Sequence, residues 1–201
     1  MPVQIGAPHQ ANFDQPLDLL QDCHRRIEHF LAVLTRVVDA SPDGRLTDET
    51  RRALLIALRY FKEAAPRHTL DEEESLFPRL RQCASDEVHD ALARVEGLQA
   101  DHLRAEVWHN DVDALGQQWL AAGQLAPEPR ATLRQRLTDL TELYKGHIHL
   151  EDTAIFPLAR KSLAPDQVTA IGQEMKARRA DILQHAGDPS KLPAYAGGTQ
   201  L

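Results

Sequence analysis

Two copies of one short pattern of histidine, glutamate and a Phe-Pro pair stand out in this 201-residue sequence. In the first copy Glu72 follows His68 by four residues, and in the second Glu151 follows His147 by four. Residues four apart in a helix lie one turn above each other on the same face. Each copy therefore presents an imidazole next to a carboxylate, which is a combination that can hold a metal ion.

Two further histidines extend this pattern into an internal repeat. His24 precedes His102 by 78 residues, and His68 precedes His147 by 79 residues. Each half of the chain thus supplies one histidine from a first helix and one His-x-x-x-Glu pair from a second. Buried carboxylates without a partner would cost on the order of several kcal/mol each, which a cation would offset. The expected metal ligands are His24, His68, Glu72, His102, His147 and Glu151.

Each of these residues also has an ordinary explanation when it is taken alone. A single histidine among apolar helix positions is most often a core residue bonded to a neighbouring group. A single His-x-x-x-Glu pair is commonly a solvent-facing pair on a helix. The register of four histidines and two glutamates across the repeat favours metal binding over these explanations, with a metal-free helical interaction module as the remaining alternative.

The donor atoms restrict the metal without fixing it. No cysteine lies among the expected ligands, and a mixed nitrogen and oxygen set suits iron or manganese but would also accept zinc. Two six-coordinate ions offer about twelve positions, of which four imidazoles, two bridging carboxylates and a bridging oxygen fill about ten. The open positions are available to water, a small gas, Glu28 or Glu106, since these glutamates follow His24 and His102 by four residues.

The elements that must position these residues are helices. Apolar residues recur at steps of three and four, which predicts an all-α, antiparallel up-down four-helix bundle with a short extra C-terminal helix. The expected boundaries are a flexible N-terminal arm at 1–13, the bundle at 14–161, the C-terminal helix at 162–185 and a disordered tail at 186–201. Pro66 predicts a kink just before His68, Pro78 distorts the last turn of the same helix, and Ser85 is expected to cap the third helix.

The composition excludes several functional classes. The net charge is −7 and basic residues do not cluster, so a nucleic-acid surface is not indicated. The longest strictly apolar run is residues 53–58, and no leader pattern opens the sequence, which gives no support for export or membrane insertion. Two cysteines, Cys23 and Cys83, cannot form a disulfide framework, so the expected location is the cytoplasm.

The ordered ligands and the Glu-x-x-x-x-Phe-Pro extensions of residues 72–78 and 151–157 resemble the hemerythrin-like family, also called HHE cation-binding domains. The likeness covers about residues 14–160, and it implies a four-helix bundle around an oxygen-bridged, non-haem di-iron centre held by the six ligands. Respiratory oxygen carriers of that family have a histidine and an aspartate where this sequence has Glu106 and Glu151. The pattern is therefore closer to the bacterial sensing and detoxifying members.

The resemblance implies a protein that binds or reacts with oxygen, nitric oxide or hydrogen peroxide for sensing or protection. An electron donor or a signalling partner protein would complete that role, which is ligand binding more than dedicated enzyme activity. One alternative is an iron-level sensor or store that acts through a partner. A second is a ferritin-like di-iron oxidase, whose Glu-x-x-His spacing occurs once, at Glu106 and His109.

The residues around the expected ligands carry weaker signals. Tyr144, one turn before His147, is expected to fill the core, although its hydroxyl could reach the site. His109 is expected to be a core histidine, with the site entrance as the alternative. Cys23 is expected to point away from the core. The residues expected at the surface are His29, His149, Glu73, Glu74 and Asp152.

Overall fold

The computed structural model describes residues 12–83 and 86–180, and between residues 86 and 93 it describes the backbone alone. Within these ranges the chain is helical almost throughout, and its one β feature is an isolated bridge between Arg45 and Gln124. The elements are α1 Pro16–Ala40, α2 Asp48–Glu63, α3 Ala65–Leu70, η1 Asp71–Leu76, α4 Phe77–Gln82, α5 Asp86–Ala122, α6 Pro127–Leu150, η2 Glu151–Ile155, α7 Phe156–Ser162 and α8 Pro165–Ala177.

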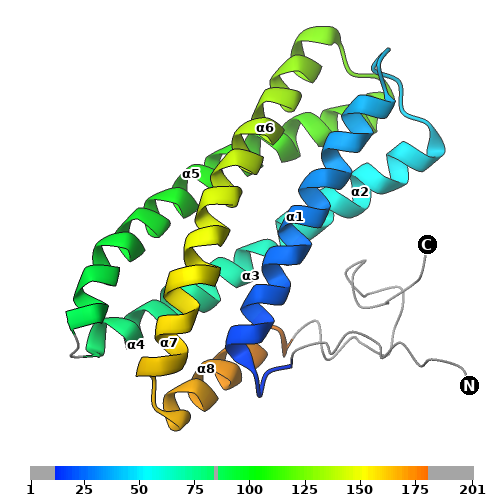
Figure 1. The fold of residues 1–201 in the computed structure, drawn as a ribbon. Helices are drawn as coiled ribbons and strands as arrows, with labels where there is room; N and C mark the ends of the chain where they lie inside the picture. The colour runs from blue at the N-terminus through cyan, green and yellow to red at the C-terminus, as the bar shows by residue number, and fades with distance from the viewer. Residues whose placement is uncertain (1–11, 84–85, 181–201) are drawn as a thin grey trace, which may run out of the picture.

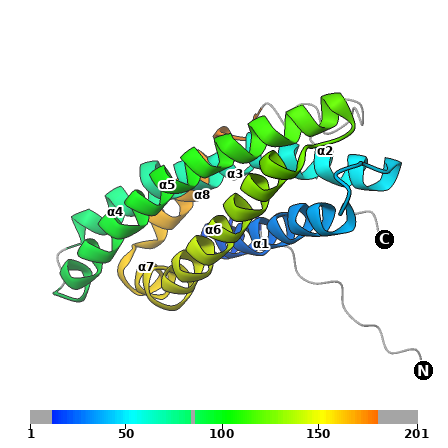
Figure 2. The same cartoon turned by 90° about the horizontal axis from the view of Figure 1, so that it is seen from above.

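These elements form four long rods that run alternately up and down (Figure 1). The first rod is α1 and the third is α5. The second consists of α2, α3, η1 and α4, and the fourth consists of α6, η2 and α7. The first and third rods each contact the second and the fourth rod. Figures 1 and 2 place α1 and α6 in one layer, with α5 and the α2–α4 rod in the layer behind. The predicted antiparallel four-helix bundle is confirmed.

The two loops at one end of the bundle are equivalent in the repeat and bond to each other. Gly44 and Gly123 both have a positive φ, at 78° and 71°, a conformation that costs glycine little. The N–H of Leu125 donates to the carbonyl of Gly44 at 2.9 Å, and the N–H of Leu46 donates to the carbonyl of Gly123 at 3.0 Å. The internal repeat thus extends from the ligand pattern to the loops that join the helices.

Prolines break the second and fourth rods near the expected ligands. Pro66 lies in the first turn of α3, directly after the end of α2 at Glu63, as the predicted kink requires. Pro78 and Pro157 each follow a π-helical segment, η1 or η2, in which the turns are wider than in an α-helix. Since proline has no N–H and its ring clashes with the carbonyl four residues earlier, a wider turn before it relieves the conflict.

The apolar core is divided into two clusters by a polar layer. One cluster fills the end of the bundle near the paired loops and includes Ile27 and Ala105, while the other includes Leu20, Leu98 and residues of α7 and α8. On α1 the residue between the clusters is His24, and on α5 it is His102. The polar layer therefore crosses the whole bundle at one level.

Helix α8 crosses the open end of the bundle and docks onto η1 (Figure 1). Ile171 and Met175 are fully buried in the second cluster, and Gly172 lies against the backbone of Phe13, where a Cβ would be 1.9 Å from the Phe13 carbonyl oxygen. The predicted C-terminal helix is therefore present as Pro165–Ala177. Ser85, residues 1–11 of the expected arm, residues 181–185 and the expected tail lie outside the described residues.

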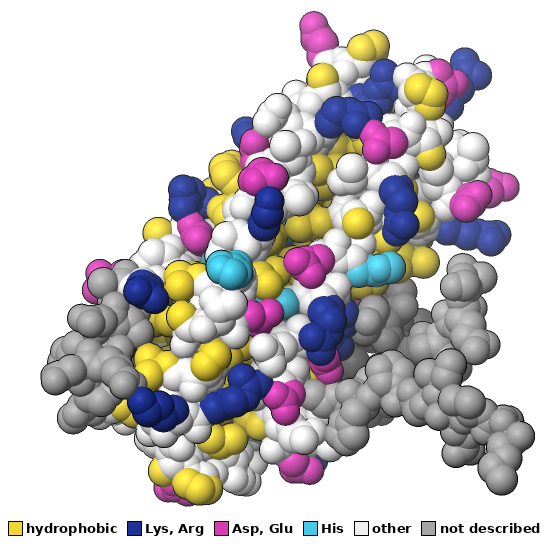
Figure 3. All heavy atoms as spheres, in the orientation of Figure 1, with side chains coloured by type: hydrophobic (Ala, Val, Ile, Leu, Met, Phe, Trp, Pro, Cys, Tyr) yellow, Lys and Arg dark blue, Asp and Glu magenta, His cyan; other side chains and the backbone are white. Residues whose placement is uncertain are grey.

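Two surface properties agree with the composition. No helix among the described residues is long and apolar enough to cross a bilayer. On the face formed by α1 and α6, acidic and basic side chains alternate and apolar side chains show between them (Figure 3). That face carries no large patch of one sign.

Candidate metal centre

Two fully buried carboxylates lie at the middle of the polar layer. Glu72 belongs to η1 and Glu151 begins η2, and neither has any exposed surface. The N–H of Phe77 donates to the carbonyl of Glu72 five residues earlier, and Phe156 makes the same bond to Glu151. The wide turns caused by the Phe-Pro pairs are therefore the turns that carry the glutamates into the bundle.

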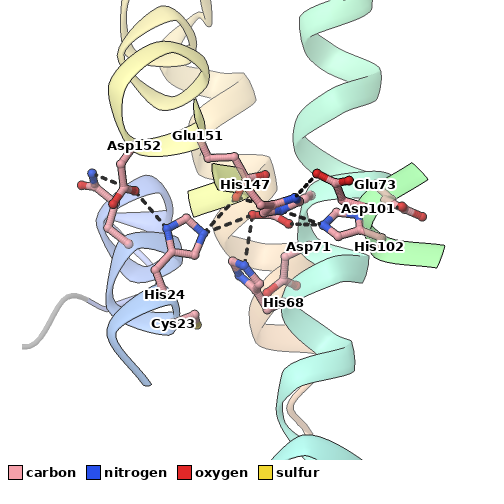
Figure 4. Close-up of polar contacts among 12 residues, drawn as sticks. Cys23, His24, His68, Asp71, Glu73, Asp101, His102, His147, Glu151 and Asp152 are labelled. Carbon is pink, nitrogen blue, oxygen red and sulfur yellow. Dashed lines mark hydrogen bonds and ion pairs between the residues drawn. The ribbon is translucent and has the colours of Figure 1, made fainter. Parts of the chain in front are cut away.

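One group of atoms that could hold a metal ion combines both carboxylates with His24 and His68. Figure 4 shows His24, His68 and Glu151 of this group. Nε2 of His24 lies 3.0 Å from Oε2 of Glu151 and 3.9 Å from Oε1 of Glu72. Nε2 of His68 lies 3.3 Å from Oε1 of Glu72. One donor atom from each of the four residues lies within 4.8 Å of all the others.

A second group combines the same carboxylates with His102 and His147. Nε2 of His102 lies 3.4 Å from Oε2 of Glu72, and Nε2 of His147 lies 3.2 Å from Oε2 of Glu151. The two Nε2 atoms are 3.2 Å apart, so both point to a common position. The structure thus brings all six residues predicted from the sequence to one level, in two groups that share both carboxylates.

The chemistry of this layer fits a cation. The oxygens of Glu72 and Glu151 are fully buried, and their polar contacts are imidazoles of the same cluster, at 3.0–3.9 Å. Buried polar groups in folded proteins are nearly always paired, and an unpaired carboxylate is the most costly kind. A positive ion at the common position would bind the carboxylates and the imidazole lone pairs together.

Residues 15–159 match the family described as Hemerythrin HHE cation binding domain. The chain belongs to this family. It is also 30% identical over 179 residues to a Haemophilus influenzae protein named only as an uncharacterized protein, and the match covers 88% of this chain and 98% of that protein. The family assignment and the buried cluster together indicate a metal-binding protein.

Two carboxylates outside the predicted set orient the leading histidines of the hemerythrin domain. Oδ1 of Asp152 lies 3.0 Å from Nδ1 of His24, and Oε1 of Glu73 lies 2.8 Å from Nδ1 of His102 (Figure 4). Glu73 and Asp152 enter neither donor group, as expected, but with side chains 31% and 32% exposed they face the histidines, and the expected surface position holds fully only for Glu74, whose side chain is 59% exposed. A carboxylate behind an imidazole fixes the ring and raises the basicity of its other nitrogen.

The phenylalanines of the two repeated motifs close the layer against the second apolar cluster. Phe156 stacks on His24 with ring centroids 5.3 Å apart, and Phe77 lies parallel to His102 at 6.5 Å. Both phenylalanines are completely buried. The predicted shielding role of the Phe-Pro pairs therefore has a specific geometry, in which each ring covers the histidine contributed by the other half.

Three histidines of the layer have pKa values far from the ordinary value of 6.5. Burial lowers the pKa of His24, but hydrogen bonds to Asp152, Glu151 and Glu72 outweigh burial and raise the pKa to about 12. Burial likewise lowers the pKa of His102, and its contacts with Glu72 and Glu73 raise it to about 9. For His68, burial prevails and the pKa falls to about 4. Protons on two histidines therefore balance the carboxylates, and a cation must displace them.

Glu28 and Glu106, the less certain ligands, do not enter either group. Both are exposed, although each follows a ligand histidine by four residues. Glu28 lines a groove between α1 and α6, and Glu106 lies in the wall of a cavity beside α5. Four residues advance a straight helix by slightly more than one turn, and at these two positions the added rotation carries the side chain out of the bundle.

The remaining candidates are placed as follows. The hydroxyl of Tyr144 lies 3.0 Å from Nε2 of His109, so this tyrosine fills the core and bonds away from the two ligand groups. His29 and His149 are exposed, as expected. The expectation that Cys23 points away from the core is wrong: it is 7% exposed, because α1 is covered by neighbouring elements over more than one narrow stripe.

A cavity of about 420 Å³ adjoins the second ligand group. Its wall includes His68, His102 and His147, with His109 and Tyr144 one to two turns further along α5 and α6. His109 lines this cavity and also bonds to Tyr144, so features of both interpretations considered for it are present.

Proposed function

We propose that this hemerythrin-domain protein binds two iron ions joined by an oxygen bridge, and that it binds or reacts with a small diatomic or peroxide ligand. The proposed ligands are His24, His68, Glu72, His102, His147 and Glu151. One observation carries the proposal: the two donor groups share Glu72 and Glu151, whose oxygens are fully buried and face the four imidazoles of the cluster. A carboxylate with two such oxygens can bridge two cations, and the nitrogen and oxygen donors suit iron.

The side chains around the centre support binding of a small ligand. A pair of ferrous ions supplies an open coordination position and two electrons. Asp152 and Glu73 hold the rings of His24 and His102 while the charge of the centre changes. Phe77 and Phe156 exclude water from one side, and the cavity beside His102 and His147 offers a route from the other.

Oxygen, nitric oxide or hydrogen peroxide would serve as the ligand, in sensing or in protection. The electron donor or signalling partner would be a separate protein. The free Cys23 and Cys83 suit a reducing compartment, and we place this function in the cytoplasm.

The test is loading of the full chain with ferrous iron under anaerobic conditions. Two irons per chain are expected, together with a change in the visible spectrum on adding oxygen, nitric oxide or hydrogen peroxide. Glu72→Gln and His147→Ala should lose iron, since the first removes the charge and one oxygen of a proposed bridging carboxylate and the second removes a proposed imidazole ligand. Glu28→Gln, at an exposed site, is the matched control and should retain it. Absence of iron, or a spectrum indifferent to all three ligands, would rule the function out.

A second candidate is an iron-level sensor or store, and the polar layer between two apolar clusters favours it. If the metal holds these halves together, its removal changes the fold that a partner protein meets. Melting temperatures with and without a chelator separate the two functions: a collapse of the folded chain on chelation favours the sensor. No observation favours the di-iron oxidase, because neither Glu106 nor His109 enters the donor groups.

A further inference from the structure

The cavity beside the second ligand group is much larger than the proposed small ligand requires. Its volume is about 420 Å³, whereas a water molecule occupies about 30 Å³ of liquid and a diatomic gas needs little more. Cavities of roughly 300–1,000 Å³ are typical of sites for organic ligands. An entrance for a gas would need only a narrow channel, so the size of this cavity calls for a different occupant.

Most of the exposed surface of the cavity wall is apolar, and part of it is aromatic. Ile27, Ala65 and Ala105 are buried residues of the wall, and Phe61 and His109 add two rings stacked at 4.4 Å. Flat rings on the wall favour a flat aromatic occupant, which can stack on them or meet them edge to face. The wall thus selects for shape as well as for low polarity.

The wall also carries polar side chains, namely Thr69, Glu73, Asn110 and the histidines of the candidate centre, and it includes one hydrogen-bonded pair deeper in the core. The hydroxyl of Tyr144 bonds to Nε2 of His109 at 3.0 Å, and both residues line the cavity. Burial lowers the pKa of His109 to about 4, and burial, with the charges of Glu72 and Glu151, raises the pKa of Tyr144, so both groups are neutral at pH 7. The direction of this hydrogen bond depends on the His109 tautomer, and in either direction the Tyr144 oxygen keeps a lone pair that can accept a hydrogen bond from an occupant.

The mouth of the cavity shows no preference for charge. Lys62 and Glu106, of opposite sign, are both exposed there. Leu103, 67% exposed, and Leu70, 39% exposed, present apolar surface at the same place. A charged ligand would meet no unbalanced partner at this mouth, whereas an apolar one would cover two exposed leucines.

We propose that this cavity is a binding site for a neutral aromatic molecule of one or two rings that carries a hydroxyl group, a phenol or naphthol in chemical class. The rings lie among Phe61, Ala105 and Leu103, and the hydroxyl donates to the Tyr144 oxygen. The occupant would lie against the side of the cluster formed by His68, His102 and His147. The inference rests on the cavity and holds whether or not iron is bound.

Calorimetric titration of the full chain with 1-naphthol tests the proposal, with 1-fluoronaphthalene as the isosteric probe without the hydroxyl. Saturable binding of one 1-naphthol per chain is expected, about three- to tenfold tighter than 1-fluoronaphthalene, as one hydrogen bond would give. Tyr144→Phe should reduce that preference to about onefold. Binding of both probes with equal strength to the unmodified chain would overturn the role of the Tyr144 hydroxyl.

A matched pair of surface variants locates the binding. Leu103→Glu adds a charge at the mouth and should weaken 1-naphthol binding about tenfold or more. Val107→Glu makes the same change one turn further along α5, at a residue that is 59% exposed and outside the cavity wall, and should leave binding unchanged. Equal effects of the two variants, or no saturable binding at all, would overturn the proposal. The titrations are repeated with iron-loaded and with chelated protein. Binding of 1-naphthol to chelated protein would support the cavity proposal even if the iron-binding proposal failed.

Discussion

Asp152 belongs to the second half of the chain, and its carboxylate lies 3.0 Å from Nδ1 of His24 in the first half. Its repeat counterpart Glu73 makes the reverse connection, to Nδ1 of His102 at 2.8 Å. Each half of the repeat thus orients the leading histidine of the other half. Neither half can form a complete site alone, and the duplication is required by the geometry of the centre.

The first prediction concerns this cross-connection. Asp152→Asn keeps the size of the side chain and removes its charge, so His24 becomes a weaker base. Iron affinity should fall about 10- to 100-fold with little change in fold. Competition with a chelator measures the affinity, and circular dichroism checks the fold. Asp43→Asn, in the loop at the far end of the bundle, is the control and should bind iron as the unmodified chain does.

The second prediction is a stability maximum near pH 6.5 for the metal-free chain. His24 and His102 have raised pKa values in the folded state, so the stability they contribute is present below about pH 6.5 and is lost as pH rises toward 9. The loss amounts to at most about 1.4 kcal/mol per pH unit for each histidine. Below the maximum, His68 and His109 act in the opposite sense, because their pKa values are lowered to about 4.

Urea unfolding of chelated protein between pH 4 and pH 9 measures this profile. Iron-loaded protein should behave differently on the alkaline side, since bound cations replace the protons of His24 and His102 and iron affinity rises with pH. A metal-free chain whose stability increases steadily from pH 6.5 to pH 9 would contradict the protonation states assigned to these histidines.

The third prediction concerns the docking of α8. The fully buried carboxylate of Asp71, beside Glu72, accepts hydrogen bonds from Arg179 at 2.5 Å and from Arg178 at 2.9 Å. Arg179→Ala leaves that carboxylate with one partner and should lower the unfolding free energy by about 2–4 kcal/mol. Chemical denaturation gives the value, and Lys176→Ala, exposed on the same helix, should cost under about 0.5 kcal/mol.

A double-variant cycle separates this ion pair from simple packing. If the cost of Arg179→Ala arises from the unpaired carboxylate, Asp71→Asn in the same chain should recover part of it. Additive losses in the double variant would show that the arginine acts through its apolar contacts instead.

The fourth prediction concerns the prolines behind the wide turns. Pro157→Ala restores an N–H and removes the ring, so η2 can tighten toward an ordinary α-helix. The metal-free chain should gain about 1 kcal/mol of stability, while iron affinity should fall about tenfold because Glu151 rotates away from its position. Denaturant midpoints and chelator competition measure the two effects. Unchanged affinity would mean that the wide turn does not position the glutamate.

Much of this candidate site could be predicted because its motif occurs twice in the sequence. The spacing of His68 to Glu72 and of His147 to Glu151 fixes a shared helix face, and its repetition gives the register of the rods. Family membership and the four-helix bundle follow from the same pattern. Gly44 and Gly123, 79 residues apart, repeat the spacing again in the loops that join the helices.

What the sequence did not reveal depends on departures from regular α-helix. Helical periodicity places Glu73 and Asp152 off the ligand face, yet the wider turns of η1 and η2 bring them to the histidines. Both residues follow a ligand glutamate and precede a Phe-Pro pair, and that combination was the available signal. The pairing of Asp71 with Arg178 and Arg179 joins residues over a hundred positions apart and depends on where α8 docks, which no local pattern encodes.

The polar layer between the two apolar clusters also determines where the four-helix bundle is least stable. Ordinary helices fray at their ends and hold firm at their centres. In this chain one end of the bundle is joined by the Gly44–Leu125 loop pair and the other by α8. The polar layer at the middle is stable only when the charges of its carboxylates are neutralised. Withdrawal of cations would therefore loosen the molecule from its middle outward, and amide hydrogens around His24 and His102 would exchange before those of either extremity.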